Sequence, residues 1–232
     1  MNAVFVFCIF AMSFLTAQAQ EVPILLGGAP SNQILASEIA KTVRPGSVIV
    51  MGELHGLKTS RQAQLELLQA LRNQGLKISV GLEFFYYPDQ LVVDSYRAGQ
   101  MDESQFLTQI QWGGISFDFY RDQALFPVYP FGERTLALNA PQALTRRISK
   151  VGLVGLNSDE LQLLPPNFQV GRDSYKKRFL AMMPHIPSPE AGDRYFAAQS
   201  VWDDTMAWKA ADFIRAHSDQ VLVIVVGDFH AQ

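Results

Sequence analysis

Val48-Ile-Val-Met-Gly-Glu-Leu-His55 is the most informative stretch of this sequence. A short apolar run that ends at a glycine is typical of a strand buried on both faces of a parallel sheet. The polar residues begin where the apolar run stops, so Glu53 and His55 fall at the carboxyl end of the strand. Open α/β sheets bind their ligands at that end of their strands.

The end of the chain repeats this pattern, because the apolar run 221–226 is followed by Gly227-Asp-Phe-His230. Two further apolar runs, 77–82 and 135–138, end at Glu83 and Asn139. Segments with helical spacing alternate with these strands, at 34–43, 59–73, 88–97, 101–110, a segment that ends at 150, and 195–216. This alternation predicts an α/β fold with a mostly parallel central sheet and helices on both faces. Residues 152–192 are predicted to form a loop-rich or helical insertion with one short helix near 175–182.

Length and composition are those of a single domain. The chain has 232 residues, of which 48% are hydrophobic, and a formal net charge of −3. This charge gives no indication of a nucleic-acid partner. We expect one domain over residues 20–232 that is truncated at its C-terminus, because only Ala231 and Gln232 follow the last strand and its motif.

Residues 1–19 are typical of a secretory signal peptide. An apolar segment runs from Ala3 to Leu15, and Ala17-Gln18-Ala19 has the form of a cleavage site. A membrane anchor would require a longer span. The prediction is therefore an exported protein that is periplasmic or associated with the outer membrane. Cys8 lacks the context of a lipoprotein cleavage site, so any membrane association would not run through a lipobox.

The strand ends supply a cluster of acids and histidines. Because parallel strands point the same way, Glu53, His55, Glu83 and His230 are predicted to share one edge of the sheet. Such a set can act as general acid and base or bind a divalent metal, although no closely spaced metal motif is present. Each residue alone has a simpler explanation as a capping, salt-bridge or supporting residue. Gln62 and Gln64 are expected near this edge, as is one of the mid-helix residues Asp203 and Asp204.

Aromatic residues crowd the segments that begin at the same edge, in 84–87 and 112–120. Most are expected to be ordinary core. A glycine pair flanked by Trp112 and Tyr120 is less typical of core, and flat apolar surfaces beside a phenol suit a planar cofactor. A tyrosinate can ligate ferric haem.

An ordered set of motifs resembles the ChaN-like haem-binding family, within a wider group that includes the Tiki proteases and erythromycin-esterase-like enzymes. The set spans roughly residues 45–230. It comprises Gly52-Glu-Leu-His55 with Gln62 and Gln64, Gly81-Leu-Glu-Phe-Phe85 with Gln90, Trp112 and Tyr120, Leu138-Asn-Ala-Pro141, Ala198-Gln-Ser-Val-Trp-Asp-Asp-Thr-Met-Ala207, and Gly227-Asp-Phe-His230.

The resemblance implies an exported α/β protein of iron or haem acquisition. In the family, a tyrosine of one subunit ligates the haem iron and a histidine of the other subunit bonds the propionates, so that two haems lie face to face in a homodimer. The tyrosine corresponds best to Tyr120, with Trp112 beside it and Tyr129 as the fallback, and the histidine corresponds by order to His185.

The Tiki branch implies an alternative, a metal-dependent hydrolase of peptidase or esterase type. Glu53, His55, Glu83 and His230 would be its catalytic residues. Glu53, His55 and His230 would bind its divalent metal ion.

Overall fold

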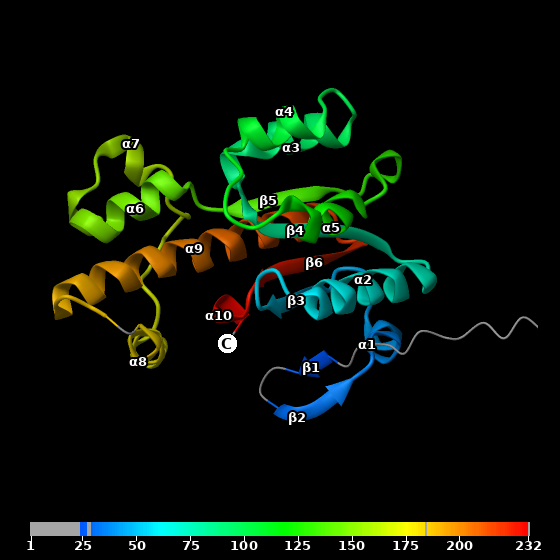
Figure 1. Cartoon of the computed structure of the whole chain (residues 1–232), viewed down its shortest axis with the longest axis horizontal. Helices are drawn as coiled ribbons and strands as arrows, with labels where there is room; N and C mark the ends of the chain where they lie inside the picture. The colour runs from blue at the N-terminus through cyan, green and yellow to red at the C-terminus, as the bar shows by residue number, and fades with distance from the viewer. Residues whose placement is uncertain (1–23, 27–28, 184, 232) are drawn as a thin grey trace, which may run out of the picture.

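The computed structural model describes residues 24–26, 29–183 and 185–231 (Figure 1). The predicted signal segment, residues 1–19, lies outside the described residues. A small antiparallel sheet of β1 (Ile24–Leu26) and β2 (Ala29–Ile34) precedes the main domain. This hairpin is not among the elements that the sequence predicts.

The main sheet consists of β3 (Val48–Glu53), β4 (Lys77–Tyr86), β5 (Thr135–Asn139) and β6 (Gln220–Gly227). The strand order is β3-β6-β4-β5, and every neighbouring pair is parallel. The predicted α/β fold with a parallel sheet is confirmed. β6 lies between β3 and β4, so the two strands that carry the glycine–acid–histidine motifs are neighbours.

The helices occupy most of the predicted segments. They are α1 (Ala36–Thr42), α2 (Lys58–Asn73), α3 (Gln90–Arg97), α4 (Glu103–Gln109), α5 (Arg121–Leu125), α6 (Gln142–Val151), α7 (Ser158–Leu161), α8 (Asp173–Met182), α9 (Pro189–Ala216) and α10 (Asp228–Ala231). The predicted insertion contains α7 and α8, and α9 begins six residues earlier than expected, at Pro189 instead of Tyr195. Ser188 explains this earlier start, because its side chain accepts the Ala191 N–H and caps the helix.

β6 shows how the sheet is buried on both faces. Val221, Val223 and Val225 pack in the core that includes α1 and α2. Leu222 and Ile224, which point to the opposite face, pack against α9 in a second core. The unbroken apolar run of β6 therefore follows from its central place between two layers of helices.

The two edges of the sheet differ. The side-chain amide of Gln90 in α3 bonds the outer edge of β5, with Nε2 2.9 Å from the Thr135 carbonyl oxygen and Oε1 2.8 Å from the Ala137 amide nitrogen. On β3, at the other edge, Val48 and Val50 are 43% and 53% exposed. Gln90 thus takes the place of a neighbouring strand at the β5 edge of the sheet.

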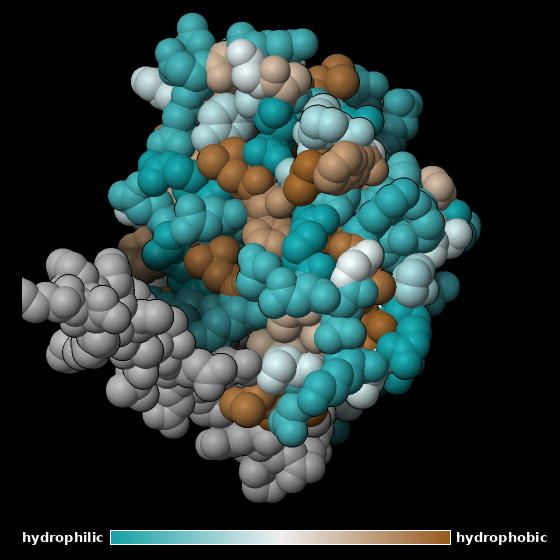
Figure 2. All heavy atoms as spheres, turned by 90° about the vertical axis from the view of Figure 1, so that its right-hand side faces the viewer, coloured by the Kyte–Doolittle hydropathy of each residue, from teal (hydrophilic) through white to brown (hydrophobic). Residues whose placement is uncertain are grey.

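The surface of one end of the molecule carries several separate apolar patches among hydrophilic residues (Figure 2). Among the helices of the described residues, none combines the length and the apolar character that crossing a bilayer requires.

Candidate functional site

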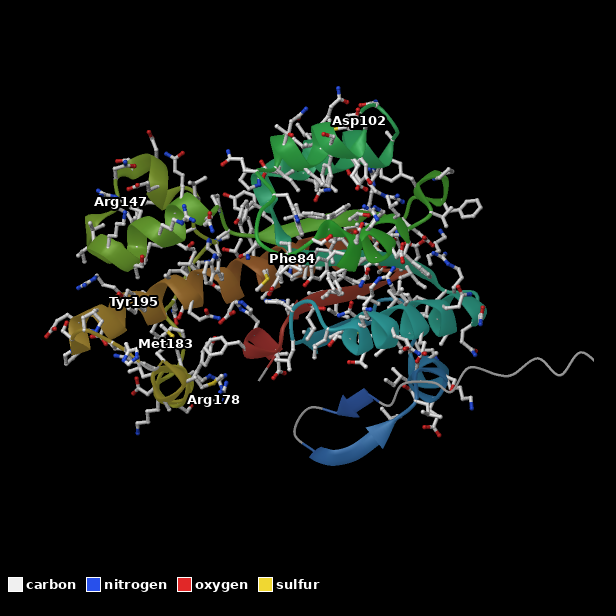
Figure 3. The ribbon with its side chains drawn as sticks, in the orientation of Figure 1. Phe84, Asp102, Arg147, Arg178, Met183 and Tyr195 are labelled. Atoms are coloured by element: carbon white, nitrogen blue, oxygen red, sulfur yellow. The ribbon has the colours of Figure 1, made fainter. Side chains whose placement is uncertain are left out.

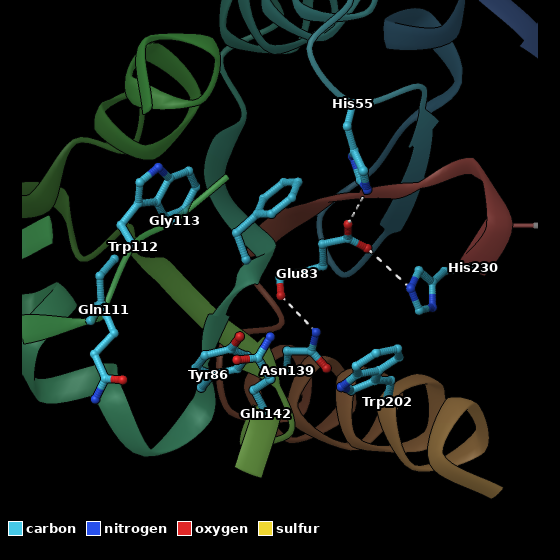
Figure 4. Close-up of a pocket in the computed structure, with 12 residues that line it drawn as sticks. His55, Glu83, Tyr86, Gln111, Trp112, Gly113, Asn139, Gln142, Trp202 and His230 are labelled. Carbon is cyan, nitrogen blue, oxygen red and sulfur yellow. Dashed lines mark hydrogen bonds and ion pairs between the residues drawn. The ribbon is translucent and has the colours of Figure 1, made fainter. Parts of the chain in front are cut away.

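The carboxyl ends of β3, β4 and β6 bring the predicted acids and histidines together (Figure 4). Glu83 lies between the two imidazole rings. One carboxylate oxygen is 3.2 Å from Nε2 of His55, and the other is 3.5 Å from Nε2 of His230. The Gly227 N–H donates to Glu83 across 2.8 Å and fixes the carboxylate.

His55 is held by a buried carboxylate. Its Nδ1 lies 3.0 Å from Glu53, which also accepts hydrogen bonds from the Tyr120 hydroxyl and the Gln64 amide, both at 2.6 Å. Because an ionised carboxylate only accepts hydrogen bonds, the proton between Glu53 and His55 belongs to Nδ1. The remaining nitrogen, Nε2, is directed at Glu83.

His230 is held in the same way by residues of α8 and α9. Its Nδ1 lies 2.5 Å from Asp203, which also accepts from the Tyr175 hydroxyl at 2.6 Å and from the Gln199 amide at 3.3 Å. The Gln199 nitrogen lies 3.0 Å from the same Nδ1, but two nitrogen donors cannot bond one another, so the Nδ1 proton goes to Asp203. We call each set of tyrosine, glutamine and carboxylate a cradle; the first comprises Tyr120, Gln64 and Glu53, and the second comprises Tyr175, Gln199 and Asp203.

The cradles shift the acidities of the central groups. The hydrogen bond to Glu53 raises the pKa of His55, although partial burial opposes it. Burial works to lower the pKa of His230, but Asp203 and Glu83 outweigh burial and raise the pKa. Burial raises the pKa of Glu83, despite the opposing effects of His230 and the Gly227 amide. Both imidazoles therefore favour the protonated form, and Glu83 holds a proton more readily than an exposed carboxylate.

Both motif glycines allow a close approach. A Cβ at Gly227 would lie 3.0 Å from Cε1 and Nε2 of His55, so a side chain there would displace the ring. A Cβ at Gly52 would lie 3.0 Å from Cβ of Ala231 in α10. Gly227 makes room for the histidine of the first motif, and Gly52 makes room for α10, which carries the second motif. This close approach explains why a glycine precedes the acid in both motifs.

The first cavity, cavity 1, opens above the central carboxylate and has a volume of about 370 Å³. Aromatic and amide side chains surround the His55–Glu83–His230 floor. The residues that line cavity 1 are His55, Glu83, Phe84, Tyr86, Ile110, Gln111, Trp112, Gly113, Asn139, Gln142, Trp202 and His230.

A second cavity, cavity 2, lies between α6, the end of α8, α9 and α10 and has a volume of about 490 Å³. Its walls are mainly apolar, and they also carry the phenol of Tyr195 and the guanidinium of Arg146. Cavity 2 is lined by Gln142, Thr145, Arg146, Ser149, Phe179, Met183, Tyr195, Ala198, Gln199, Trp202, Phe229 and His230. Tyr195 and Met183 lie at the α8–α9 end of the molecule (Figure 3). Gln142, Trp202 and His230 line both cavities.

The residues expected to bind haem lie apart. Trp112 lines cavity 1, as expected for the aromatic wall. Tyr120 lines neither cavity: it is 1% exposed, its hydroxyl bonds Glu53, and burial together with Glu53 raises its pKa strongly. Tyr129 lies shortly before the amino end of β5, away from the carboxyl ends of the strands, and its hydroxyl bonds Arg134.

The position of Tyr120 therefore corrects the expectation that it faces an opening. The sequence placed it correctly beside the strand ends, but the hydrogen bond to Glu53 turns its hydroxyl into the core. His185 is exposed in the connection between α8 and α9, two residues after Met183 of cavity 2.

No group of three or more acids, histidines or cysteines with the placement of a metal site occurs in the described part of the chain. The Glu53, His55 and His230 metal alternative gains no support, because the Nδ1 nitrogens of the two rings bond carboxylates and both Nε2 nitrogens face Glu83.

Comparison with known proteins gives two findings. A family model described as haem-binding uptake, Tiki superfamily, ChaN, matches residues 39–232. The solved structure of cofacial heme binding to ChaN of Campylobacter jejuni is similar, with a TM-score of 0.58 and 17% sequence identity over 84% of this chain and 76% of that chain. No curated protein matches.

Proposed function

Because the chain belongs to the haem-binding uptake family of the Tiki superfamily, ChaN, we propose that it binds haem. The observation that carries this proposal is cavity 2, an apolar cavity with a phenol and a guanidinium in its wall. Ligand sites are usually concave and mostly apolar, with a few polar groups that fix orientation. We also propose that the protein is exported and takes part in iron or haem acquisition.

Tyr195 is the tyrosine best placed to bind the iron. Its hydroxyl has no hydrogen-bond partner among the described residues, and its ring lines cavity 2. A tyrosinate ligates ferric haem in other proteins. Tyr120, the ligand expected from the sequence, would first have to leave the core and break its bond to Glu53.

The polar ends of haem require cations or hydrogen-bond donors. Arg146 in the wall of cavity 2 can bind a propionate through its planar guanidinium. His185 is exposed close in sequence to that cavity and, in a homodimer, would bond a propionate of the haem held by the other subunit. We also propose that the protein forms a homodimer in which the two haems face one another between the subunits.

The test is a titration of the protein with ferric haem, followed by its visible absorption spectrum. Wild type and Tyr120→Phe should both show a high-spin, tyrosinate-ligated spectrum, and Tyr195→Phe should lose it. Tyr129→Phe is the matched control and should match wild type. Loss of the spectrum in Tyr120→Phe alone would show that Tyr120 is the iron ligand. Absence of a haem complex in wild type would refute the proposal that the protein binds haem.

Assembly is tested in the same samples. Sedimentation velocity should show a dimer when haem is present, and His185→Ala should weaken that dimer without removing the iron–tyrosinate spectrum. A monomer at saturating haem would contradict the face-to-face arrangement.

A further inference from the structure

The turn after α4 is strained, and it lines cavity 1. Gln111 has a φ of 53°, in the left-handed region that is unfavourable for a residue with a Cβ. The Gln111 amide lies 3.1 Å from the Thr108 carbonyl oxygen, and the Trp112 amide lies 2.8 Å from the Leu107 carbonyl oxygen. These two bonds form a Schellman motif, in which glycine usually occupies the position of Gln111.

The strained turn delivers two side chains to the cavity, because both Gln111 and Trp112 line it. Figure 4 shows these two residues on one side of Glu83, with Trp202 and His230 on the other side. Stability alone would favour glycine at position 111. Strained backbone is often retained at ligand sites, so the glutamine side chain points to a ligand in cavity 1.

The charges at the floor of cavity 1 are already paired with one another. His55 lies between the carboxylates of Glu53 and Glu83. His230 lies between the carboxylates of Asp203 and Glu83. The described residues that line the cavity include no lysine or arginine. An anionic ligand would therefore find no unpaired cation in the lining and a cationic ligand no unpaired carboxylate, which favours an uncharged ligand.

The polar groups that remain free in cavity 1 belong to amides and a phenol. The side chains of Gln111, Gln142 and Tyr86 line the cavity and have no hydrogen-bond partner among the described residues. Asn139 donates one amide hydrogen to the Glu83 carbonyl oxygen and keeps a second. An amide or a phenol can both donate and accept, and a ligand hydroxyl matches both roles. A ligand with several hydroxyl groups would therefore satisfy this set.

The aromatic walls supply the apolar contacts that a sugar ring requires. A sugar ring has polar edges and apolar C–H faces, and such a face stacks on a flat aromatic ring. Trp112 is fixed in place, because its Nε1 donates to the Ile115 carbonyl oxygen across 2.8 Å and its ring packs edge-on against Phe84. A nucleobase would also stack, but its donors and acceptors lie in one plane, whereas the free groups of cavity 1 come from separate segments of the chain.

We propose that cavity 1 binds an uncharged saccharide of one or two rings, with Trp112 against a C–H face of the sugar and the amides of Gln111 and Gln142 on its hydroxyl groups. The cavity volume of about 370 Å³ lies toward the lower end of the range for ligand sites, roughly 300–1,000 Å³, and limits the ligand to this size. Sugar binding goes beyond haem binding and does not rest on it, because Tyr195 lines cavity 2 and not cavity 1.

The first experiment screens the full-length protein by saturation-transfer NMR against glucose, galactose, mannose, N-acetylglucosamine, maltose, cellobiose and lactose. At least one of these sugars should bind, with a Kd below about 1 mM by calorimetry. The sugar that binds best is then compared with its uronate and its amine derivative, which differ from it in charge, and it should bind about tenfold more tightly than either. Absence of binding by every sugar would refute the proposal, as would tighter binding of a charged derivative or of adenosine.

Gln111→Gly separates a role in binding from a role in the fold. Loss of the amide should weaken the affinity for the sugar about tenfold, which corresponds to about 1.4 kcal/mol. The same substitution should raise the midpoint of urea denaturation, because glycine adopts the left-handed conformation without strain. A structural role alone would change stability and leave the affinity as in wild type.

Asn167→Gly is the matched control for this substitution. Asn167 is the other non-glycine residue with a positive φ, 58°, in the described part of the chain, and it lines neither cavity. Asn167→Gly should keep the affinity of wild type, and so should Tyr195→Phe, which separates sugar binding from haem binding. Affinities unchanged in both Gln111→Gly and Gln142→Ala would place the sugar outside cavity 1 and overturn the proposal.

Discussion

The phenol of Tyr120 donates a 2.6 Å hydrogen bond to the carboxylate of Glu53, inside the core. This bond connects the aromatic segment after α4 to the end of β3. It makes Tyr120 part of the support of His55, because Glu53 in turn accepts from Nδ1 of that ring.

Tyr120→Phe should therefore act on stability. The substitution leaves Glu53 with one donor fewer in a buried site, which costs about 1–3 kcal/mol. Urea denaturation measures the change. Tyr86→Phe is the control, because Tyr86 is only partly buried. A stability equal to that of wild type would show that the hydroxyl is not bonded in solution.

The central histidines make stability depend on pH. The pKa values of His55, His230 and Glu83 are all raised in the folded protein. A group with a raised pKa stabilises the fold below its unfolded pKa and loses that contribution as pH rises through the folded pKa. The melting temperature should therefore fall as pH rises above about 6.5, the ordinary pKa of histidine.

The variant His55→Gln/His230→Gln should remove most of that slope. Glu53, Glu83 and Asp203 are the carboxylates that face the two rings, and all three remain in this variant. A slope equal to that of wild type would assign the pH dependence to other groups.

Glu133 is a buried carboxylate that holds together the segments at the amino ends of β4 and β5. It accepts from the Arg72 guanidinium and from the amides of Ile78, at 3.0 Å, and Val128, at 2.6 Å. Glu133→Gln should cost about 3 kcal/mol, as for other buried ion pairs that lose one partner. The exposed Lys77–Asp219 pair gives a control, because Asp219→Asn should change stability little.

The carboxylate of Glu133 should also make the folded protein less stable at acid pH. Burial raises the pKa of Glu133, but Arg72 and the two amides outweigh burial and lower it overall. A lowered pKa gives stability above the unfolded pKa that is lost as pH falls through the folded pKa. Wild type should lose more stability than Glu133→Gln between neutral pH and values below about 4.3. Urea denaturation at the two pH values measures the difference.

Gln90→Ala tests the capped edge of the sheet. The substitution leaves the Thr135 carbonyl and the Ala137 amide without their side-chain partner and should cost about 2 kcal/mol. Gln69→Ala, which removes an exposed amide bonded only to Asn73, should stay within about 0.5 kcal/mol of wild type. Equal effects of the two substitutions would show that water replaces Gln90 at no cost.

Gly227→Ala tests the close approach of the two motifs. The added methyl group meets the His55 ring at 3.0 Å and should cost about 1–3 kcal/mol while displacing that ring from Glu83. Gly113→Ala is the control, because a Cβ there meets no atom within 4 Å. A stability equal to that of wild type in Gly227→Ala would show that the backbone moves to accommodate the methyl group.

The strands could be predicted from the sequence because residues 48–51 and 221–226 are apolar without interruption. Burial on both faces is confirmed for β6, but it is wrong for β3, because β3 is an edge strand on which Val48 and Val50 are exposed. The same patterns placed Glu53, His55, Glu83 and His230 at one edge, and the structure brings them together. Asp203, expected only as one of two mid-helix acids, reaches this edge and holds His230.

The rest depended on side-chain directions that the sequence does not encode locally. Tyr175 lies in the short helix predicted near 175–182, which is α8, but its role requires α8 to pack on α9. Tyr120 was placed in the right segment, but whether its hydroxyl points to solvent or to Glu53 is decided by packing. Tyr195 offered no motif at all; only its position on the wall of cavity 2 distinguishes it.

The shared wall formed by Trp202 and His230 links the two cavities thermodynamically. A molecule that moves either side chain on entering one chamber alters the free energy of occupation of the other, and reciprocity makes the factor equal in both directions. Occupants of the two cavities would therefore act as effectors of one another, so the protein would report the presence of one through its affinity for the other.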